Sequence, residues 1–194
     1  MFSVNIDKIV NMTDNEKKCY DEVRETVKSE LNGGKVLAVT RNGIGAFKIA
    51  YSFVSDGEKV LFIDADIMSE IFLGKYKLGK NLKGFTDYFQ EDDAIHDLVC
   101  KTNRKNLDII FTGETQEFDK ADILDSEFSD FRDCLVEQYD YVIVHTGDNY
   151  DIAAKCDASV ILLKQSDYSE MSAESKVDFL DSNGCFVLGL VVEE

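Results

Sequence analysis

The sequence predicts an α/β fold: a single domain spanning residues 1–194, with a doubly wound, mostly parallel sheet flanked by helices. Two observations predict it. Short apolar runs with the length of buried strands recur along the chain. Stretches of helical period separate most of these runs, and such alternation is typical of parallel sheets. No internal repeat, low-complexity tract or linker interrupts the pattern, and 194 residues suffice for one sizeable core.

The elements follow in order along the chain. A surface helix is expected over residues 14–31, ended by the run Asn32, Gly33 and Gly34. The apolar runs predict strands at about 35–40, 59–64, 107–111, 141–145, 158–164 and 185–191. The helical patterns between them predict helices at 46–55, 84–98, 120–138, 150–155 and 169–182. The segment 67–83 is the least regular part.

Residues 36–50, VLAVTRNGIGAFKIA, have the outline of a phosphate-binding loop. An apolar strand leads into a turn that contains Gly43 and Gly45, and Lys48 opens an apolar helix. In this layout backbone N–H groups and a helix N-terminus can hold phosphates. The alternative is a plain strand–turn–helix connection with no ligand.

Two working parts of such a loop are missing. A loop of the GxxxxGK[ST] type has glycine before its lysine, where a side chain would block the close approach of a phosphate. Phe47 occupies that position here. The residue after the lysine supplies a hydroxyl to Mg²⁺, and Ile49 has no oxygen to offer.

Polar side chains follow two later strand patterns. Asp64 and Asp66 end the run EKVLFIDADI, and His145 lies near the end of YDYVIVHTGD. Because ligands bind at the carboxyl ends of parallel strands, we expect these residues and Lys48 to converge on one crevice. Lys48 is expected to form an internal salt bridge with Asp64 or Asp66. His145 is expected to be a buried, hydrogen-bonded neutral side chain, with titration near neutral pH as the alternative.

A family resemblance rests on six segments in this order: VT–GIGAFK, VLFIDADI, KGFTDYF, LDIIFTGE, EFSDFRDCLVEQYDYVIVHTGD and VLGLVVEE. Together, from Tyr20 to Val192, the chain resembles the bacterial tyrosine kinases (BY-kinases) of capsule and exopolysaccharide synthesis, which are P-loop proteins related to the MinD/ParA group. The resemblance implies a P-loop NTPase-like fold. It places Lys48 at the loop lysine and Asp64 and Asp66 at aspartates that assist Mg²⁺ and the attacking hydroxyl.

The departures from the family pattern fall on the chemistry. Phe47 and Ile49 replace the glycine and the Ser/Thr of the Walker A loop, and His145 replaces the Mg²⁺-supporting aspartate of the Walker B-like motif. Phosphoryl transfer relies on positioning, Mg²⁺ and cationic charge, so these losses together should lower the rate by on the order of 10³-fold or more. We therefore expect no metal site, no confident catalytic residue and no cofactor. Vestigial positions remain: Asp64 and Asp66 for catalysis, and Gly43, Gly45 and Lys48 for a phosphate loop.

Composition limits the partners. Lys and Arg number 21 against 38 Asp and Glu, a net charge of −17, which disfavours binding to nucleic acid and to anionic lipid. No 18-residue apolar run and no signal peptide is apparent, so we expect a cytoplasmic protein without direct membrane insertion. The five cysteines lack a CxxC spacing and are expected to be reduced core thiols.

Two basic features bear on assembly. Related kinases close rings through an E-x-x-R-x-x-R pattern on the first helix, and here Asp21, Arg24 and Val27 occupy those positions, with Lys28 adjacent. A ring is therefore not expected, although a homo-oligomer stays open. The lysines of the 67–83 segment form either a solvated loop or a docking strip; they are Lys75, Lys77, Lys80 and Lys83.

Three functions remain open from the sequence. The first is a catalytically impaired regulatory or scaffold subunit in capsular or exopolysaccharide biosynthesis. Such a subunit would be recruited to the inner face of the membrane by a membrane-anchored polysaccharide co-polymerase or adaptor, or would contact an active kinase paralogue. The second is a weakly active tyrosine kinase or ATPase that uses ATP and Mg²⁺. The third is a binding module for another small anion.

Overall fold

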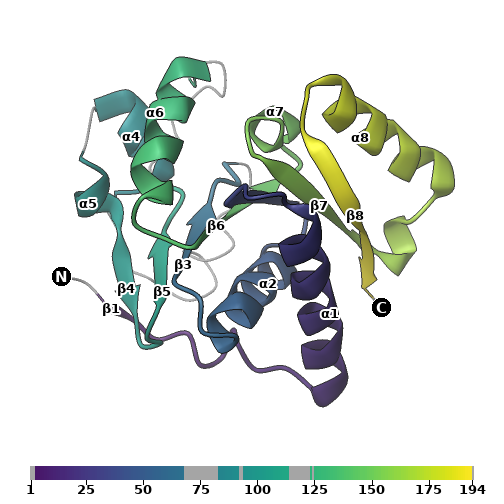
Figure 1. Ribbon diagram of the computed structural model, residues 1–194, viewed down its shortest axis with the longest axis horizontal. Helices are drawn as coiled ribbons and strands as arrows, with labels where there is room; N and C mark the ends of the chain where they lie inside the picture. Colours follow the sequence, from purple (N-terminus) through teal and green to yellow (C-terminus); the bar gives the residue numbers. More distant parts are fainter. Residues whose placement is uncertain (1–2, 68–82, 92–93, 114–122, 124, 194) are drawn as a thin grey trace.

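The protein forms one eight-stranded sheet with helices on both faces (Figure 1). The computed structural model describes residues 3–67, 83–91, 94–113, 123 and 125–193. The strands lie in the order β1-β4-β5-β3-β6-β2-β7-β8. Their bounds are β1 Ser3–Val4, β2 Val36–Thr40, β3 Val60–Asp64, β4 Cys100–Thr102, β5 Leu107–Ile110, β6 Tyr141–Gly147, β7 Ala158–Lys164 and β8 Phe186–Glu193. Neighbours run parallel except β4 and β5, which are antiparallel.

Two apolar clusters hold the layers together. On one face α1 (Asp14–Glu30) and α2 (Gly43–Ser55) pack on the sheet. On the other face lie α4 (Phe85–Glu91), α5 (Ile95–Leu98), α6 (Asp125–Val136), α7 (Tyr150–Ala153) and α8 (Glu170–Ser182), with a short 3₁₀ turn, η2 (Gln165–Asp167), before α8. The central strands β2 and β3 are buried at every residue, which explains why each is apolar up to its last residue, Thr40 in β2 and Asp64 in β3.

The predicted α/β class, with its doubly wound and mostly parallel sheet, is confirmed. Six strands lie where the apolar runs predicted them. The predicted helix at 84–98 is two helices, α4 and α5. The strands β1 and β4 were missed, because two or three residues are too few to show a period.

The first helix shows why these elements begin where they do. The Thr13 hydroxyl accepts a hydrogen bond from the backbone N–H of Glu16, and the Glu16 carboxylate accepts one from the backbone N–H of Thr13. This reciprocal capping box satisfies N–H groups that the first turn leaves unpaired. In the described ranges of the chain, no helix is both long and apolar enough to cross a bilayer.

Candidate functional site

The helix α2 begins earlier than predicted. It starts at Gly43 rather than near residue 46, because Asn42 caps it: the Asn42 side-chain oxygen accepts a hydrogen bond from the Ile44 N–H at 3.1 Å. The expectation that Gly43 and Gly45 form a flexible turn is therefore wrong, since both lie in the first helical turn. The connection from β2 into α2 is short.

The two residues that stand where a Walker A loop has glycine and Ser/Thr belong to the apolar core. Phe47 and Ile49 are fully buried on α2. The Phe47 ring meets the Phe62 ring of β3 edge-on, with centroids 4.9 Å apart. Burying two such side chains stabilises the fold by about 1.5–3 kcal/mol each, so these positions now contribute to packing.

The predicted salt bridge of Lys48 with Asp64 or Asp66 is wrong. The Lys48 ammonium lies 2.6 Å from the Glu16 carboxylate on α1, and the Lys48 side chain is only 13% exposed. The hydrogen bond from Lys48, together with those from Thr13, lowers the pKa of Glu16 to about 2. Lys48 therefore joins α2 to α1.

A carboxylate from the last strand lies against the first turn of α2. The two Glu193 oxygens accept hydrogen bonds from the Tyr20 hydroxyl, at 2.6 Å, and from the Asn42 side-chain amide. A Cβ added to Gly45 would lie 2.5 Å from Glu193 Oε1 and 2.7 Å from Leu162 Cδ1. A side chain at position 45 would therefore have to displace Glu193, which occupies a position of favourable potential near a helix N-terminus.

Asp64 and His145 form a buried pair across β3 and β6. His145 Nδ1 lies 2.9 Å from Asp64 Oδ1, and Nε2 lies 3.3 Å from the Arg41 carbonyl oxygen. Both neighbours are acceptors, so a proton is needed on Nε2 and another between Nδ1 and Oδ1. Burial raises the pKa of Asp64. Burial opposes the imidazolium of His145, but the Asp64 carboxylate outweighs this effect and raises the pKa of His145. His145 is therefore buried and hydrogen-bonded as expected, and Asp64 shifts its pKa in the direction that favours the protonated imidazole.

The same contacts fix the β2–α2 connection. Arg41 has a positive φ of 72°, a strained conformation for a side-chain-bearing residue. Its N–H donates to the Gly147 carbonyl at 2.8 Å, while its own carbonyl faces His145. A Cβ on Gly147 would lie 2.6 Å from both carboxylate oxygens of Asp66. Asp64, Asp66 and His145 therefore meet at the carboxyl edge of the sheet as predicted, whereas the partner of Lys48 lies on α1.

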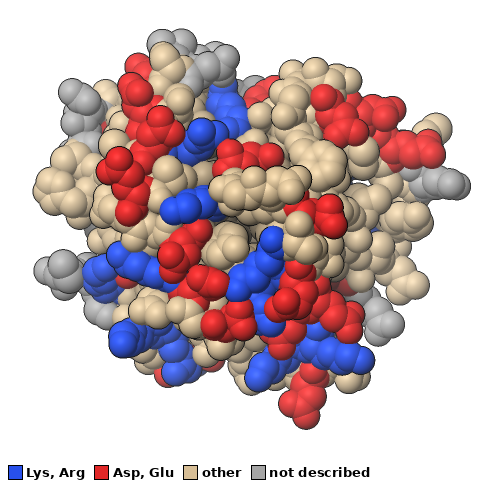
Figure 2. All heavy atoms as spheres, in the orientation of Figure 1, with Lys and Arg blue, Asp and Glu red and all other residues tan. Residues whose placement is uncertain are grey.

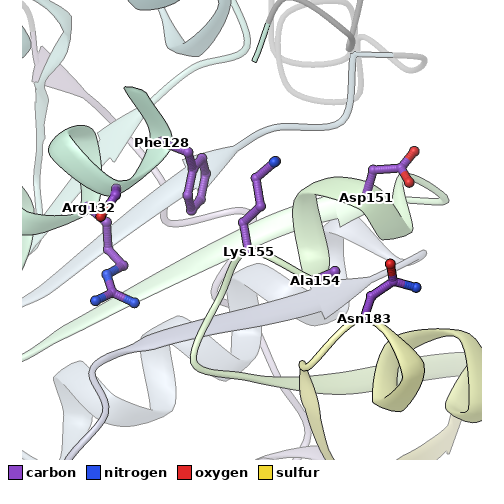
Figure 3. A pocket seen from close by; sticks show the side chains of 7 residues that line it. Phe128, Arg132, Asp151, Ala154, Lys155 and Asn183 are labelled. Atoms are coloured by element: carbon purple, nitrogen blue, oxygen red, sulfur yellow. The ribbon is translucent and has the colours of Figure 1, made fainter. Parts of the chain in front are cut away.

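Clefts open to solvent occur at several places in the described part of the chain, one of them along the exposed face of α1, and two others bear on the functional question. One of about 440 Å³ lies at the carboxyl ends of β7 and β8 and is lined by Asn42, Lys164, Gln165, Ser166 and Glu193. The other, of about 410 Å³, lies on the opposite face between α6, α7 and α8 (Figure 3). Because α7 is only four residues long, it does not fill this layer. The Phe128 ring and the Lys155 side chain project into the space that it leaves (Figure 3).

Comparisons with known proteins agree in sequence and in fold. Tyrosine-protein kinase CpsD of Streptococcus pneumoniae serotype 4 is 27% identical over 179 residues, covering 85% of this chain and 79% of that protein. CpsD of Streptococcus agalactiae is 23% identical over 201 residues, covering 97% and 88%. The chimeric protein CapA2B2 superposes with a TM-score of 0.81 at 16% identity, covering 98% of this chain and 92% of that chain. The kinase domain of the Escherichia coli tyrosine kinase ETK gives 0.76 at 16% identity, covering 89% and 74%.

The chain is a relative of the bacterial tyrosine kinases. No protein-family model matches it. The wider P-loop fold is also evident: the septum site-determining protein MinD from Pyrococcus horikoshii, complexed with Mg-ADP, gives a TM-score of 0.60 at 15% identity and covers 81% of this chain and 69% of that chain.

A BY-kinase loop holds a magnesium nucleotide with its lysine and its Ser/Thr hydroxyl. The side chains at these positions here, Lys48 and Ile49, do not fit that mode of binding. The oxygen that Mg²⁺ needs is absent at Ile49, and Lys48 is engaged by Glu16. Asp64 Oδ1 is hydrogen-bonded to His145 Nδ1 and is buried, so this oxygen is already engaged. Within the part of the chain that the structure describes, no group of three or more His, Cys, Asp or Glu residues is arranged to hold a metal ion.

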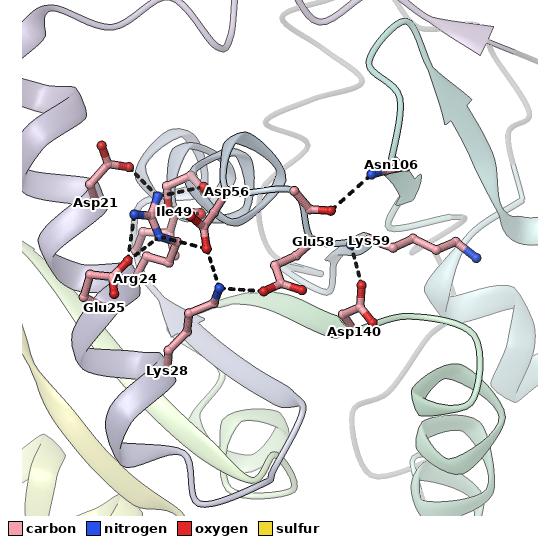
Figure 4. A network of polar contacts seen from close by, with 12 residues as sticks. Asp21, Arg24, Glu25, Lys28, Ile49, Asp56, Glu58, Lys59, Asn106 and Asp140 are labelled. Atoms are coloured by element: carbon pink, nitrogen blue, oxygen red, sulfur yellow. Dashed lines mark hydrogen bonds and ion pairs between the residues drawn. The ribbon is translucent and has the colours of Figure 1, made fainter.

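The ring-closing pattern of BY-kinases is replaced by contacts within the chain (Figure 4). Arg24, 11% exposed, donates to Asp21 at 2.6 Å and to the Ser52 carbonyl at 3.0 Å. Val27, at the second arginine position, is 1% exposed in the core. Lys28 contacts both Asp56 and Glu58 at 2.5 Å. Arg24 and Lys28 thus join α1 to the last turn of α2 and to the residues that follow it.

The predicted docking strip lies almost wholly outside the described residues: only Lys83 is described, and it is exposed. Figure 2 shows acidic and basic side chains intermingled over α1, with acidic ones predominant over α8. Sequence reasoning missed Glu16 and Glu193 as site residues. The spacing of Thr13 and Glu16 is that of a capping box and was the available signal for Glu16, whereas no local pattern indicates Glu193.

Proposed function

We propose that this protein is a catalytically impaired BY-kinase relative that acts as a regulatory or scaffold subunit in capsular or exopolysaccharide biosynthesis. The observation that carries the proposal is the first turn of α2. Phe47 and Ile49 pack in the core there, and Lys48 is held by Glu16. Releasing Lys48 toward a nucleotide would break its ion pair with Glu16, and within the described ranges of the chain no cluster of ligand residues compensates for the missing metal ligand.

The electrostatics of the neighbouring cleft support the same proposal. The Glu193 carboxylate lines this cleft and contacts Asn42 and Gly45, beside the turn that would receive phosphates. A polyphosphate entering here would meet a negative charge in a chain of net charge −17. Two like charges brought together without water between them disfavour binding by several kcal/mol.

The partners in this proposal are a membrane-anchored polysaccharide co-polymerase or adaptor, or an active kinase paralogue. The relatives named tyrosine-protein kinase CpsD and the chimeric CapA2B2 motivate this choice. The protein would work in the cytoplasm and reach the inner face of the membrane through its partner. Co-purification of the full chain with a membrane fraction only when the partner is expressed is the expected result.

Calorimetry tests the loss of nucleotide chemistry. We expect no micromolar binding of ATP or ADP with Mg²⁺, and no transfer of labelled phosphate to tyrosine in the protein or in an acidic tyrosine copolymer. An active CpsD kinase measured in parallel is the positive control. Micromolar, metal-dependent binding would overturn the proposal and favour the second candidate, a weak kinase or ATPase, which the grouping of Asp64, Asp66 and His145 at the carboxyl edge supports.

A third candidate is a module for another small anion, with Lys164 in the 440 Å³ cleft as the cation. Binding of sulfate, phosphate or a sugar phosphate without metal, abolished by Lys164→Gln, would favour it. The matched control is Lys155→Gln on the other face of the sheet.

A further inference from the structure

Exposed apolar side chains gather at one end of the sheet. Six large apolar side chains are exposed in the described part of the chain, and all belong to the last segment: Tyr168, Met171, Phe179, Phe186, Leu190 and Val192. Scattered single residues of this kind are ordinary on protein surfaces, but a concentration on one strand and its adjoining helix marks an interaction site.

The strand β8 carries three of these side chains and forms an edge of the sheet. The opposite edge, β1, has two residues, whereas β8 has eight. Its pairing with β7 is regular from Gly189 to Glu193, after one register shift. Edge strands are usually protected by lysine or proline, and β8 (FVLGLVVE) has neither. Gly189 meets nothing within 4 Å on its Cβ side.

An acidic helix borders this edge. The register pairs Leu190 with Ile161 and Val192 with Leu163, and both partners belong to the apolar cluster that α8 covers. The helix exposes three carboxylates, those of Glu174, Asp178 and Asp181. In Figure 2 acidic side chains gather at the upper right, where Figure 1 places α8. Among the residues that the structure describes, no strand pairs with the outer side of β8, so this surface is an apolar strand edge with negative charge beside it.

We propose that the outer edge of β8 binds an extended segment of a partner protein that carries both apolar and basic side chains. Such a segment would add a strand to the sheet, with main-chain hydrogen bonds supplying affinity and side chains supplying selectivity. Its apolar side chains would cover Leu190 and Val192, and its basic ones would be attracted by α8. A second copy of this chain is a poorer occupant, because it would bring two acidic α8 helices together.

This inference goes beyond the proposed function and does not depend on it. A strand can dock on β8 whether or not a nucleotide binds beside α2, since the two tests use different ligands and different residues.

The probe is a synthetic peptide of alternating threonine and valine with lysines at both ends, titrated into the full-length protein and followed by fluorescence anisotropy. A peptide with glutamate in place of lysine, and one with a central proline, are the controls. We expect the lysine peptide to bind at least about tenfold more tightly than either control, a difference of about 1.4 kcal/mol. Amide hydrogen exchange should slow at residues 186–193 on binding. Equal binding of the glutamate peptide, no binding of any peptide, or unchanged exchange in β8 would each overturn the proposal.

Variants locate the site. Leu190→Lys with Val192→Lys changes exposed side chains and should abolish binding, whereas Thr26→Lys with Ser29→Lys, which adds the same charge on exposed positions of α1, should not. Glu174→Gln with Asp178→Asn should weaken binding several-fold, and Glu22→Gln with Glu30→Gln on α1 should leave it unchanged. Light scattering and hydrogen exchange on the free protein test whether a second copy of the chain occupies the edge. A dimer in which β8 is already protected from exchange would show that it does and would overturn the partner-segment proposal.

Discussion

The Lys48 ammonium lies 2.6 Å from the Glu16 carboxylate, so the lysine at the loop position of the related kinases links α2 to α1. The same carboxylate caps α1 through Thr13. A residue that in a working loop would face phosphate is here part of the contact between two helices.

Replacing Glu16 with glutamine should remove this ion pair and keep the cap, since glutamine also serves in a capping box. Because Glu16 is 41% exposed, we expect a loss of below about 1 kcal/mol at pH 7. The pKa of Glu16 is lowered, so the stabilisation is present above its ordinary value near 4.5 and is lost as pH falls toward 2. Urea unfolding of both proteins from pH 7 to pH 2.5 checks this, and a difference that persists unchanged at the acid end would contradict it.

The Arg24→Ala variant tests whether α1 is fastened within the chain. Removing hydrogen bonds to Asp21 and the Ser52 carbonyl should cost about 2–3 kcal/mol, and the mass in solution should not change. The control is Lys18→Ala, because Lys18 is 78% exposed and lies 3.8 Å from Glu22; it should cost less than about 0.5 kcal/mol. If Arg24→Ala instead dissociates an oligomer without loss of stability, Arg24 serves between subunits.

A methyl group at position 45 should be poorly tolerated. Although alanine favours a helix over glycine by about 1 kcal/mol, its methyl group would displace the Glu193 carboxylate from its hydrogen bonds with Tyr20 and Asn42, so Gly45→Ala should be destabilising by about 1 kcal/mol. Glu193→Ala should relieve part of the cost, which a double-mutant cycle by urea unfolding would measure. Gly189→Ala is the matched control, because that site is open. A neutral or stabilising Gly45→Ala would contradict the observed approach of Glu193.

The Asp64–His145 pair should make stability depend on pH. The pKa of His145 is raised, so its stabilisation is full below the ordinary value near 6.5 and is lost as pH rises through the folded-state value. Near pH 6 the wild type should exceed His145→Asn by about 1–3 kcal/mol in unfolding free energy, and this advantage should shrink toward pH 9. An advantage of the wild type that grows with pH would falsify the raised pKa of His145. Asp64→Asn should remove the same pH dependence, because it removes the group that holds the proton.

The sequence was sufficient for the class of fold and most of the sheet. Central strands are buried on both faces, so β2 and β3 appear as apolar runs that end in one polar residue each. Their order with the helices leaves few topologies. The start of α2 was misplaced because the glycines were weighed as turn residues, although Asn42 is a strong helix cap.

The site was less accessible to prediction. Asp64, Asp66 and His145 were placed together correctly, since the ends of parallel strands meet at one edge. The partners of Lys48 and of Asn42 lie 32 and 151 positions away in sequence, and a pairing over such separations leaves no periodic signal. The pKa of His145 depends on its burial and on the Asp64 carboxylate, and its Nε2 faces a carbonyl of the strained Arg41; only the folded backbone reveals these contacts.

The hydrogen bond between the Tyr20 hydroxyl and Glu193 joins positions 173 residues apart. During synthesis, α1 and α2 emerge first and stay without this fastening until β8 has also left the ribosome. Closing so long a loop is slow, so the last step of folding should be the arrival of β8 on a preformed seven-stranded intermediate. A ribosome stalled before this strand would therefore present a nascent chain with the edge of β7 still open to chaperones.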